Sequence, residues 1–476
     1  DAFIDAAAPW PPERCSRLTG IPAETIRRLG RDFRNASGGC IYMSTGVNMG
    51  PFGSLAYWLV QGLHLMTGQL DRRGGLVVPR GAFDAFALAR ALGLGTADDH
   101  RTLKGGWHRV AGAFPVAALP EEIQIDHPER VRALFVSSGN PLHSTPGSAM
   151  EDALRELDLL VSIDLYQNET AKHADYLLPA TDMLERSDFP VSWTALQPTP
   201  HAQYTPRVVS PRFERREEWR IFSDLAVACG AKAFGPSLCQ LVPRINGLLG
   251  GLGLEVTPDH LLAALLRWGG QVSLAELRAN PGGVFLEATE PGSFLGRRVS
   301  TPDGRVTLDA PRILADLPRL EAFEAEQASY PRDELLLIGR RERRSHNSWL
   351  HNLPRVRGPS RQEALLHPDD ADARGIDDGA VIEICSTEGT IRLHARVTED
   401  IARGVVAVPH GWGHQDAQLS HAAALKGGNI NAVIPGGAME PVSGQAIMLA
   451  HRVRVEPSPF EEPTPTGKTR PKETAP

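Results

Sequence analysis

The segment GRRERRSHNSWLHN, Gly339–Asn352, gathers side chains that are suited to binding anions. It holds four arginines, two histidines and two asparagines, directly after an apolar run that is typical of a strand. Arginine binds phosphate oxygens through two parallel N–H groups, and a turn that begins with glycine can direct backbone N–H groups at an anion. A solvated basic loop is the alternative, although Trp349 and Leu350 make the segment partly apolar, which suits a cleft. The residues alone leave the two interpretations equally open.

Polar side chains also follow two other apolar runs. In SSGNP, Ser137–Pro141, Gly139 permits a close approach of the backbone to a ligand, and Asn140 offers both a donor and an acceptor. Asp164 ends the next run, where a carboxylate of an α/β protein often binds a ribose or a base. An ordinary strand–turn or cap is the alternative at each position. These residues become informative only in combination with others.

Two further motifs lie near the C-terminus. HGWGH, His410–His414, has two histidines, but no cysteine or carboxylate lies close to them in the sequence, so a structural role is more common than a metal site. GGNINAVIP, Gly427–Pro435, places Asn429 and Asn431 at alternate positions of a turn. Their amides could bind the N–H and C=O edge of a heterocycle.

Composition narrows the class of protein. The chain has 476 residues, enough for two to four domains with large cores. Its net charge of −7 argues against a general nucleic-acid binder. The five cysteines are scattered without a CxxC pair, which favours reduced, buried thiols. The sequence has no P-loop, GxSxG or HExxH motif and no apolar run of the ~20 residues that cross a bilayer.

The first 120 residues predict helices around one strand. Ile26, Leu29 and Phe33 have helical spacing after Pro22, and Ser54–Thr67 is apolar enough for a buried helix. Between them, the segment CIYMSTGVNMGPFG, from residue 40, predicts an apolar strand that runs into a glycine-rich turn.

A βαβ unit is predicted between Val131 and Asp164, with an amphipathic helix over 147–157 and a third short strand near Tyr176–Leu178. Doubly wound domains bind ligands at the carboxyl ends of such strands. The following region, Cys239–Ser329, predicts helix and loop without chemistry, with a helix start at Thr257 and a possible capping box from Ser273.

The last third changes to short β segments. Residues 335–339, 380–385, 390–397 and 402–413 alternate apolar and polar residues or form apolar runs, with tight turns between them, which predicts a small closed barrel. From Glu456 onward the chain holds many Pro, Thr, Glu and Lys residues and almost no apolar ones, which predicts disorder. The predicted domains are 1–120 (partial α/β, near the cofactor), 121–238 (α/β), 239–329 (connecting segment), 330–455 (barrel) and 456–476 (tail).

The motifs occur in one order: TGVNMGPFGS, LMTGQLDRRGG, LFVSSGNP, VSIDLYQNETAKHADYLLPATDMLER, GRRERRSHNSW, HPDDADARGIDDGAVIEI, PHGWGH and GGNINAVIP. This order closely resembles the molybdopterin oxidoreductases of the dimethyl sulfoxide reductase superfamily, which includes formate dehydrogenases and dissimilatory nitrate reductases. The resemblance covers nearly the whole chain apart from 239–329 and the tail, and ETAKHADYLLPATDMLE is its most specific part.

The resemblance implies a cofactor of two molybdopterin guanine dinucleotides whose dithiolenes hold one Mo or W. It assigns one dinucleotide to the doubly wound α/β domain and the other to a C-terminal barrel of the double-psi type. The residues implied in the α/β domain are Gly139, Asn140, Asp164, Thr170 and Asp175. Those implied in the barrel are Gly339, Arg340, Ser345, His346, Asn347, His410, Gly411, Trp412, Asn429 and Asn431.

The chain also departs from the family pattern. Members usually begin with a CxxC-type iron–sulfur motif and later carry a Cys, selenocysteine, Ser or Asp that ligates the metal; neither precedes TGVNMG here. Cys40 does not have the context of a metal ligand. We therefore expect a 4Fe–4S cluster only in an N-terminal part outside this sequence, name no catalytic or metal residue, and expect this chain alone to be inactive.

The resulting hypothesis is the cofactor-binding C-terminal part of an enzyme that transfers two electrons or an oxygen atom at Mo or W, with formate oxidation as the first candidate and nitrate reduction as the second. Its expected partners are a small-molecule substrate, the missing domain or a partner chain, and an electron-transfer partner, without nucleic acid or a membrane segment. A cytoplasmic location is expected, with the periplasm as the alternative. A non-catalytic scaffold subunit, or a nucleotide-binding module without redox chemistry, would be the competing classes.

Overall fold

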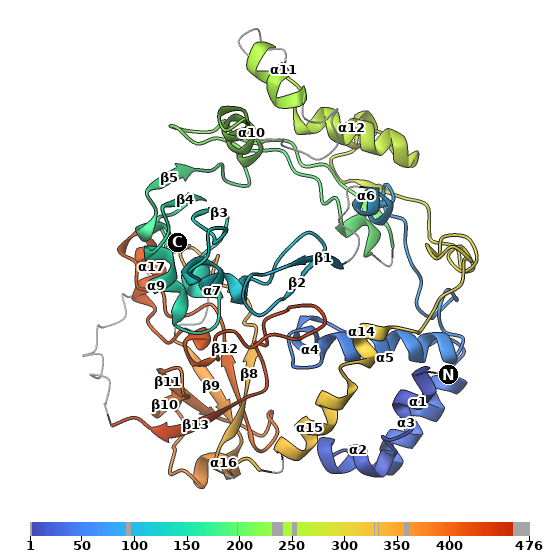
Figure 1. The fold of residues 1–476 in the computed structure, drawn as a ribbon, viewed down its shortest axis with the longest axis vertical. Coiled ribbons are helices and arrows are strands. Elements are labelled where there is room, and N and C mark those ends of the chain that lie inside the picture. Colours follow the sequence, from blue (N-terminus) through green and yellow to red (C-terminus); the bar gives the residue numbers. More distant parts are fainter. Residues whose placement is uncertain are drawn as a thin grey trace, which may run out of the picture. The chain divides into compact units, whose positions relative to one another are not determined.

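The computed structural model describes residues 2–91, 97–197, 199–230, 241–249, 255–327, 329–331, 333–356 and 361–459 (Figure 1). They form two units. Unit 1 contains the described residues of Asp1–Asn140, Glu151–Ser329 and Ala438–Ile447. Unit 2 contains those of Pro141–Met150, Tyr330–Gly437 and Met448–Pro476.

Unit 1 combines helices with three small sheets. Its helices are α1 (Ala2–Ala7), α2 (Pro12–Thr19), α3 (Ala23–Asn35), α4 (Thr45–Asn48), α5 (Gly53–Met66), α6 (Ala85–Ala91), η1 (Val116–Ala118), α7 (Leu119–Gln124), η2 (Ala171–His173), η3 (Trp193–Ala195), α10 (Glu218–Ala228), α11 (Leu241–Leu249), α12 (Pro258–Gly269), α13 (Leu274–Ala279), α14 (Pro311–Leu314) and α15 (Leu317–Gln327). Its strands are β1 (Ala97–Arg101), β2 (His108–Val110), β3 (Ala133–Ser137), β4 (Leu159–Asp164), β5 (Tyr176–Pro179), β6 (His201–Ala202) and β7 (Val284–Phe285).

The predicted α/β fold is confirmed by the parallel sheet β3-β4-β5. Its central strand is buried because apolar side chains cover both of its faces, as the continuous run LLVSI indicates. The connecting helix α9 (Ala149–Arg155) is shorter than the predicted 147–157. Gly147 has a φ of +78° and its N–H donates to Asn431 O, so the helix begins only after this residue.

The strand predicted from residue 40 is wrong. Residues 39–44 form no strand, and α4 follows them. The backbone donors that a neighbouring strand would have used bind side chains instead: Gly39 N donates to Gln69 Oε1 at 3.0 Å and Ile41 N to His64 Nε2 at 3.0 Å. Tyr42 is 88% exposed, so this segment is not buried on both faces although its composition is apolar.

The helix predicted from Thr257 is confirmed as α12, which begins at Pro258 with Thr257 as its N-cap and is followed by Gly270 in the left-handed region. Of the capping box predicted from Ser273, one half is present: Ser273 caps α13 by accepting from Glu276 N at 3.1 Å. Within the described residues, no helix combines the length and apolar composition needed to cross a bilayer.

Unit 2 contains a closed barrel of six strands in the order β10-β11-β9-β12-β8-β13, which confirms the predicted C-terminal barrel (Figure 1, orange to red). The strands are β8 (Leu335–Arg340), β9 (Glu363–Leu366), β10 (Val381–Cys385), β11 (Thr390–Val397), β12 (Val405–Pro409) and β13 (His451–Pro457). The short helices of the unit are α8 (Pro141–Ser144), α16 (Pro368–Asp372), η5 (Ala417–Leu419), α17 (Ser420–Ala424) and η6 (Ile430–Val433).

The barrel encloses an aliphatic core, because side chains along its strands alternate between the interior and the exterior. Ile391, Leu393 and Ala395 of β11 point inward and are buried, as their period of two predicts, and Ile382 and Ile384 of β10 meet them. The final strand continues through Glu456 and Pro457, which pair with β10. The composition of the C-terminal segment had placed both residues in the predicted tail. The predicted disorder of the tail otherwise falls on residues 460–476, outside the described residues.

Leu366→Ala provides a test of the barrel core. Leu366 is fully buried, so its truncation is expected to lower the free energy of unfolding by about 2–5 kcal/mol. The matched control is Leu365→Ala on the same strand, where the side chain points to the other face and is only partly buried, so the loss is expected to be smaller. Urea unfolding followed by circular dichroism measures both. Equal losses would contradict the strand register.

Candidate functional site

Polar residues of unit 1 gather at the carboxyl ends of β3 and β4. The two strands are parallel, with Ser137 paired to Ile163, so the residues after each strand lie at the same edge of the sheet. Asn168 connects them, because its Nδ2 donates to Gly139 O at 3.2 Å and to Asp164 Oδ2 at 3.1 Å. Gly139 and Asp164, which the sequence suggested separately, are therefore brought together.

Asn140 and Thr170 belong to the same cluster. Asn140 Oδ1 accepts from Thr170 Oγ1 at 2.7 Å and from Thr170 N at 3.2 Å, while Asn140 Nδ2 donates to Glu169 Oε2 at 2.6 Å. Thr170 is fully buried. The turn QNET thus holds the turn SSGNP through three hydrogen bonds.

Asp164 is the titratable group of this cluster. Burial raises the pKa of its carboxyl group, an effect that hydrogen bonds from the backbone N–H groups of Tyr166 and Leu165 oppose and the negative charge of Glu218 reinforces. Glu218 itself accepts two bonds of 2.7 Å from Arg186, and this ion pair raises the pKa of Arg186. Sequence reasoning missed Asn168, Glu169, Arg186 and Glu218; the position of Asn168 four residues after the strand end was the available signal.

Asp175 lies elsewhere. Its Oδ2 accepts from Leu160 N at 2.8 Å and its N–H donates to Leu160 O at 2.8 Å. Leu160 is at the start of β4, whereas Asp164 is at its end, a separation of four residues or about 13 Å along a strand. The carboxylate of Asp175 therefore ties β5 to β4 and is not brought together with Gly139, Asn140, Asp164 and Thr170.

In unit 2, as in unit 1, the polar loops follow two parallel neighbouring strands. Strands β8 and β12 are parallel neighbours, with Gly339 opposite Val408 and Arg340 opposite Pro409. The loop after β8 and the motif HGWGH after β12 therefore leave the barrel at the same edge. His410 joins them: its Nδ1 lies 2.9 Å from Arg340 O and its Nε2 lies 3.0 Å from Asn347 Oδ1.

The carboxylate of Glu342 also connects the two loops. Glu342 Oε2 accepts from Trp412 Nε1 at 2.9 Å, and Glu342 Oε1 pairs with Arg340 Nη2 at 3.4 Å. Burial raises the pKa of Glu342, while the Trp412 hydrogen bond and the Arg340 charge lower it. Arg340 Nε is buried and has no hydrogen-bond partner among the described residues. A guanidinium N–H in this state indicates an anion or another acceptor that completes the site.

The loop after β8 has an unusual backbone. Arg344, His346 and Asn347 have φ values of 61°, 47° and 65°, a region that side chains other than glycine's rarely occupy. Ser345 is buried, and its hydroxyl donates to Asn347 O. His346 is exposed, and its ring lies edge-on to Trp349. Strained positions of this kind cluster at ligand sites, and the turns they form direct successive N–H groups to one side.

The side chains of Asn429 and Asn431 form hydrogen bonds within unit 2. Their Nδ2 atoms donate to His143 O at 3.0 and 2.8 Å, and Asn429 Oδ1 accepts from Asn431 N at 3.1 Å. Gln362, which sequence reasoning missed, donates to Pro409 O and Gly428 O at 2.9 Å each and accepts from Gly428 N at 2.8 Å. The asparagine turn is therefore clamped beside HGWGH, and the amide donors are directed at protein backbone.

Burial shifts two histidines at this edge toward the neutral form. Burial lowers the pKa of His410, although the hydrogen bond to the Arg340 carbonyl opposes it. Burial also lowers the pKa of His351, and the neighbouring His414 adds to this effect. His414 stacks on His143 with the ring centroids 4.0 Å apart.

His410→Gln tests this assignment through pH. A lowered folded-state pKa means that the unfolded chain binds the proton more readily, so His410 contributes stability above its unfolded pKa of about 6.5 that is lost as the pH falls through this value. The difference in unfolding free energy between wild type and variant should therefore shrink between about pH 7.5 and about pH 5.5. Urea titrations at the two pH values measure it. A difference that stays constant would contradict a depressed pKa.

Gly411→Ala tests the close approach of the two loops. Gly411 has a φ of +84°, and a Cβ there would lie 1.9 Å from Asn347 O, so the loops must separate. We expect a loss of about 2–4 kcal/mol in unfolding free energy. Gly404→Ala is the control, because its φ of +76° is similar but no atom lies within 4 Å of the added Cβ, and about 1 kcal/mol is expected. Similar losses in both variants would show that the close approach of Gly411 to Asn347 does not contribute to the free energy of unfolding.

Comparison with known proteins identifies the two units. The family model of molybdopterin oxidoreductases matches residues 5–228, and that of the molybdopterin dinucleotide-binding domain matches residues 335–448. The trimethylamine-N-oxide reductase of Haemophilus influenzae is 25% identical over 84% of this chain and 52% of its own length. The F420-dependent formate dehydrogenase subunit alpha of Methanocaldococcus jannaschii is 24% identical over 84% of this chain and 57% of its own.

The chain thus spans about half the length of the curated relatives it matches. Several matching relatives are named reductases of dimethyl sulfoxide or trimethylamine N-oxide, among them those of Rhodobacter capsulatus and Escherichia coli, which are each 24% identical to this chain over 89–90% of its length. The acetylene hydratase of Pelobacter acetylenicus has the same fold, with a TM-score of 0.65 over 95% of this chain and 66% of that one at 18% identity. The chain belongs to the molybdopterin oxidoreductases of the dimethyl sulfoxide reductase superfamily and carries their molybdopterin dinucleotide-binding domain.

Proposed function

We propose that this chain binds the two guanine dinucleotides of a bis-molybdopterin cofactor, one on each unit, within a molybdenum or tungsten oxidoreductase. The observation that carries the proposal is the edge shared by β8 and β12, where a buried Arg340 N–H lacks a partner among the described residues beside loops of strained backbone. A pyrophosphate fits this edge, because it supplies the missing acceptor and the negative charge that a guanidinium stabilises.

On unit 1 we propose that Gly139, Asn140, Asp164 and Thr170 bind the first dinucleotide. These residues lie together at the carboxyl ends of parallel strands, the usual ligand position in an open α/β sheet. Asp164 would accept from ribose hydroxyls or from the N–H edge of guanine. Asp175, which the resemblance also implied, would act only indirectly by holding β5 against β4.

On unit 2 the proposed ligands of the second dinucleotide follow β8 and β12. Arg340 would bind phosphate oxygens, and the backbone N–H groups around Ser345, His346 and Asn347 would surround them. His410 and the Gly411–Trp412 turn would border the same space. Asn429 and Asn431 would support this turn through their bonds to His143 O rather than read a base with their donors.

When bound, the metal of the cofactor would supply two-electron or oxygen-atom transfer, and the residues of this chain would bind and orient it. For the substrate we propose a sulfoxide or N-oxide, which the names of the relatives favour over the formate or nitrate first expected. We assign no residue of this sequence as the metal ligand or as a ligand of an iron–sulfur cluster. A non-catalytic scaffold is the alternative, but a scaffold does not require a partly exposed arginine whose Nε–H is buried and unsatisfied among the described residues.

Arg340→Ala tests the proposal. The loss of a charged hydrogen bond is expected to cost roughly 1.5–3 kcal/mol, which is about ten- to a hundredfold in cofactor affinity. The control is Arg361→Ala, whose exposed side chain pairs with Glu363 and faces no proposed ligand. Both variants and the wild type would be purified from cells that make the cofactor, and guanine nucleotide and molybdenum would be measured per chain. Equal loading of the two variants would show the basic loop to be a surface feature.

A further inference from the structure

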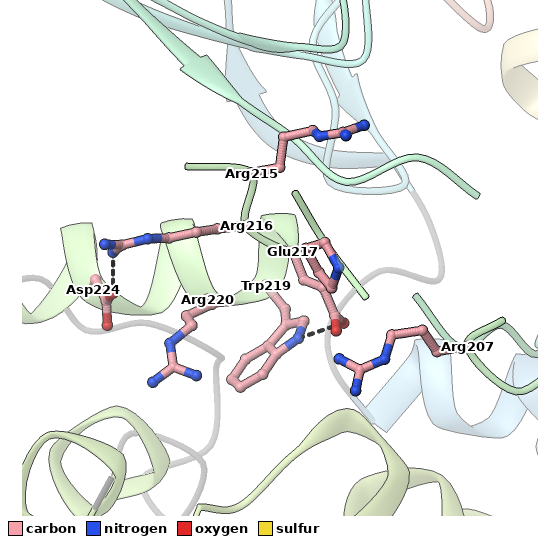
Figure 2. A pocket seen from close by; sticks show the side chains of 8 residues that line it. Arg207, Arg215, Arg216, Glu217, Trp219, Arg220 and Asp224 are labelled. Atoms are coloured by element: carbon pink, nitrogen blue, oxygen red, sulfur yellow. Dashed lines mark hydrogen bonds and ion pairs between the residues drawn. The ribbon is translucent and has the colours of Figure 1, made fainter. Parts of the chain in front are cut away.

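A second arginine-rich site lies in unit 1, on the segment that leads into α10. Arg207, Arg215, Arg216, Arg220, Glu217 and Trp219 are among the side chains that line a pocket of about 450 Å³ (Figure 2). None of them belongs to the residues proposed above for the cofactor. Sites for small ligands typically measure about 300–1,000 Å³, so a mononucleotide fits this volume. The function proposed so far leaves this pocket unused.

The pocket gathers arginines on a chain whose net charge is −7. Four arginines line it, together with the carboxylates of Glu217 and Asp224. Glu185 and Glu255, outside the lining, pair with two of these arginines, so the four positive groups are balanced by four negative ones. An anion would therefore be attracted by the arginines that are least firmly paired, and not by a net excess of charge.

The arginines differ in how firmly they are already paired. Arg215 pairs at 3.0 Å with Glu185, whose side chain is almost fully buried, and Arg220 makes two bonds to Glu255. These two are held in place and largely neutralised. Arg216 lies 3.7 Å from Asp224 with both side chains exposed, a pair that contributes little. Arg207 has no hydrogen bond or ion pair within the described part of the chain. Arg207 and Arg216 can therefore turn to an incoming phosphate.

Trp219 supplies the pocket with an aromatic surface. Its Nε1 donates to Glu217 Oε2 at 2.8 Å, which limits rotation of the indole, and the ring is only partly buried (Figure 2). A fixed, accessible ring beside arginines is the combination by which proteins bind a base through stacking and its phosphates through charge. We propose that this pocket binds a nucleotide, with its base on Trp219 and its phosphates on Arg207 and Arg216.

The test is isothermal titration calorimetry of the purified chain with ADP, pyrophosphate and adenosine. An adenine nucleotide is used because its base differs from the guanine of the proposed cofactor, and each titration is repeated with Arg340→Ala because the site proposed at Arg340 would also accept a pyrophosphate. ADP is expected to bind more tightly than either part alone. Arg207→Ala should weaken ADP binding by about tenfold or more, the loss for a charged hydrogen bond. Trp219→Ala should weaken it by about five- to a hundredfold, the range for base stacking, and Trp219→Phe should restore most of it.

The controls separate this pocket from the cofactor sites. Arg305→Ala removes an exposed arginine elsewhere in unit 1 and should leave ADP binding unchanged. Arg207→Ala should leave the loading of guanine nucleotide and molybdenum unchanged, while Asp164→Ala should lower that loading and leave ADP binding intact. No binding of ADP, equal affinity for ADP and pyrophosphate, or unchanged ADP affinity in Arg207→Ala would each overturn the proposal, whatever the outcome for the cofactor.

Discussion

Parallel pairing of strands determines where the polar residues of this protein can meet. In unit 2, β8 and β12 run side by side with Arg340 opposite Pro409, so the loops that follow them must leave the barrel at one edge. In unit 1, β3 and β4 have the same relation, and SSGNP and Asp164 end at one edge of the sheet. Both candidate sites depend on this constraint, because each combines residues from two motifs that are far apart in the sequence.

Where the loops after β8 and β12 meet, burial shifts the pKa values of their titratable side chains. Glu342 lies between Arg340 and Trp412, where it partly neutralises the guanidinium and fixes the indole. The pKa of Glu342 is raised and that of His410 is lowered for the same reason, because burial disfavours whichever form is charged. An arginine keeps its charge under these conditions, and Arg340 is therefore the group at this edge best suited to a phosphate.

Close packing explains the glycine and the strained residues of the same edge. Gly411 approaches Asn347 O so closely that no Cβ fits, and three residues of the opposite loop adopt positive φ values. Such conformations cost energy in a free loop and persist only where the surroundings hold them. His410 and Ser345 supply part of that support through their bonds to Arg340 and Asn347. The geometry of the site is thus built before any ligand arrives.

The sequence by itself determined the elements and the family. Continuous apolar runs predicted β3 and β4, alternation predicted β10 and β11, and the order of motifs indicated the molybdopterin oxidoreductases, because these signals are local or lie in fixed sequence order. It failed at residues 39–44, where an apolar composition suggested a strand but the side chains of Gln69 and His64 take the backbone donors.

Only the tertiary structure decided which polar groups act together. It joined Asn168 to Gly139 and Asp164, separated Asp175 from them, and directed the amides of Asn429 and Asn431 at His143 O. It also revealed Glu342 and Gln362 as the residues that hold the barrel loops. Spacing along a chain cannot give these results, because hydrogen bonds depend on the register of strands and on loop paths that bring distant residues within about 3 Å.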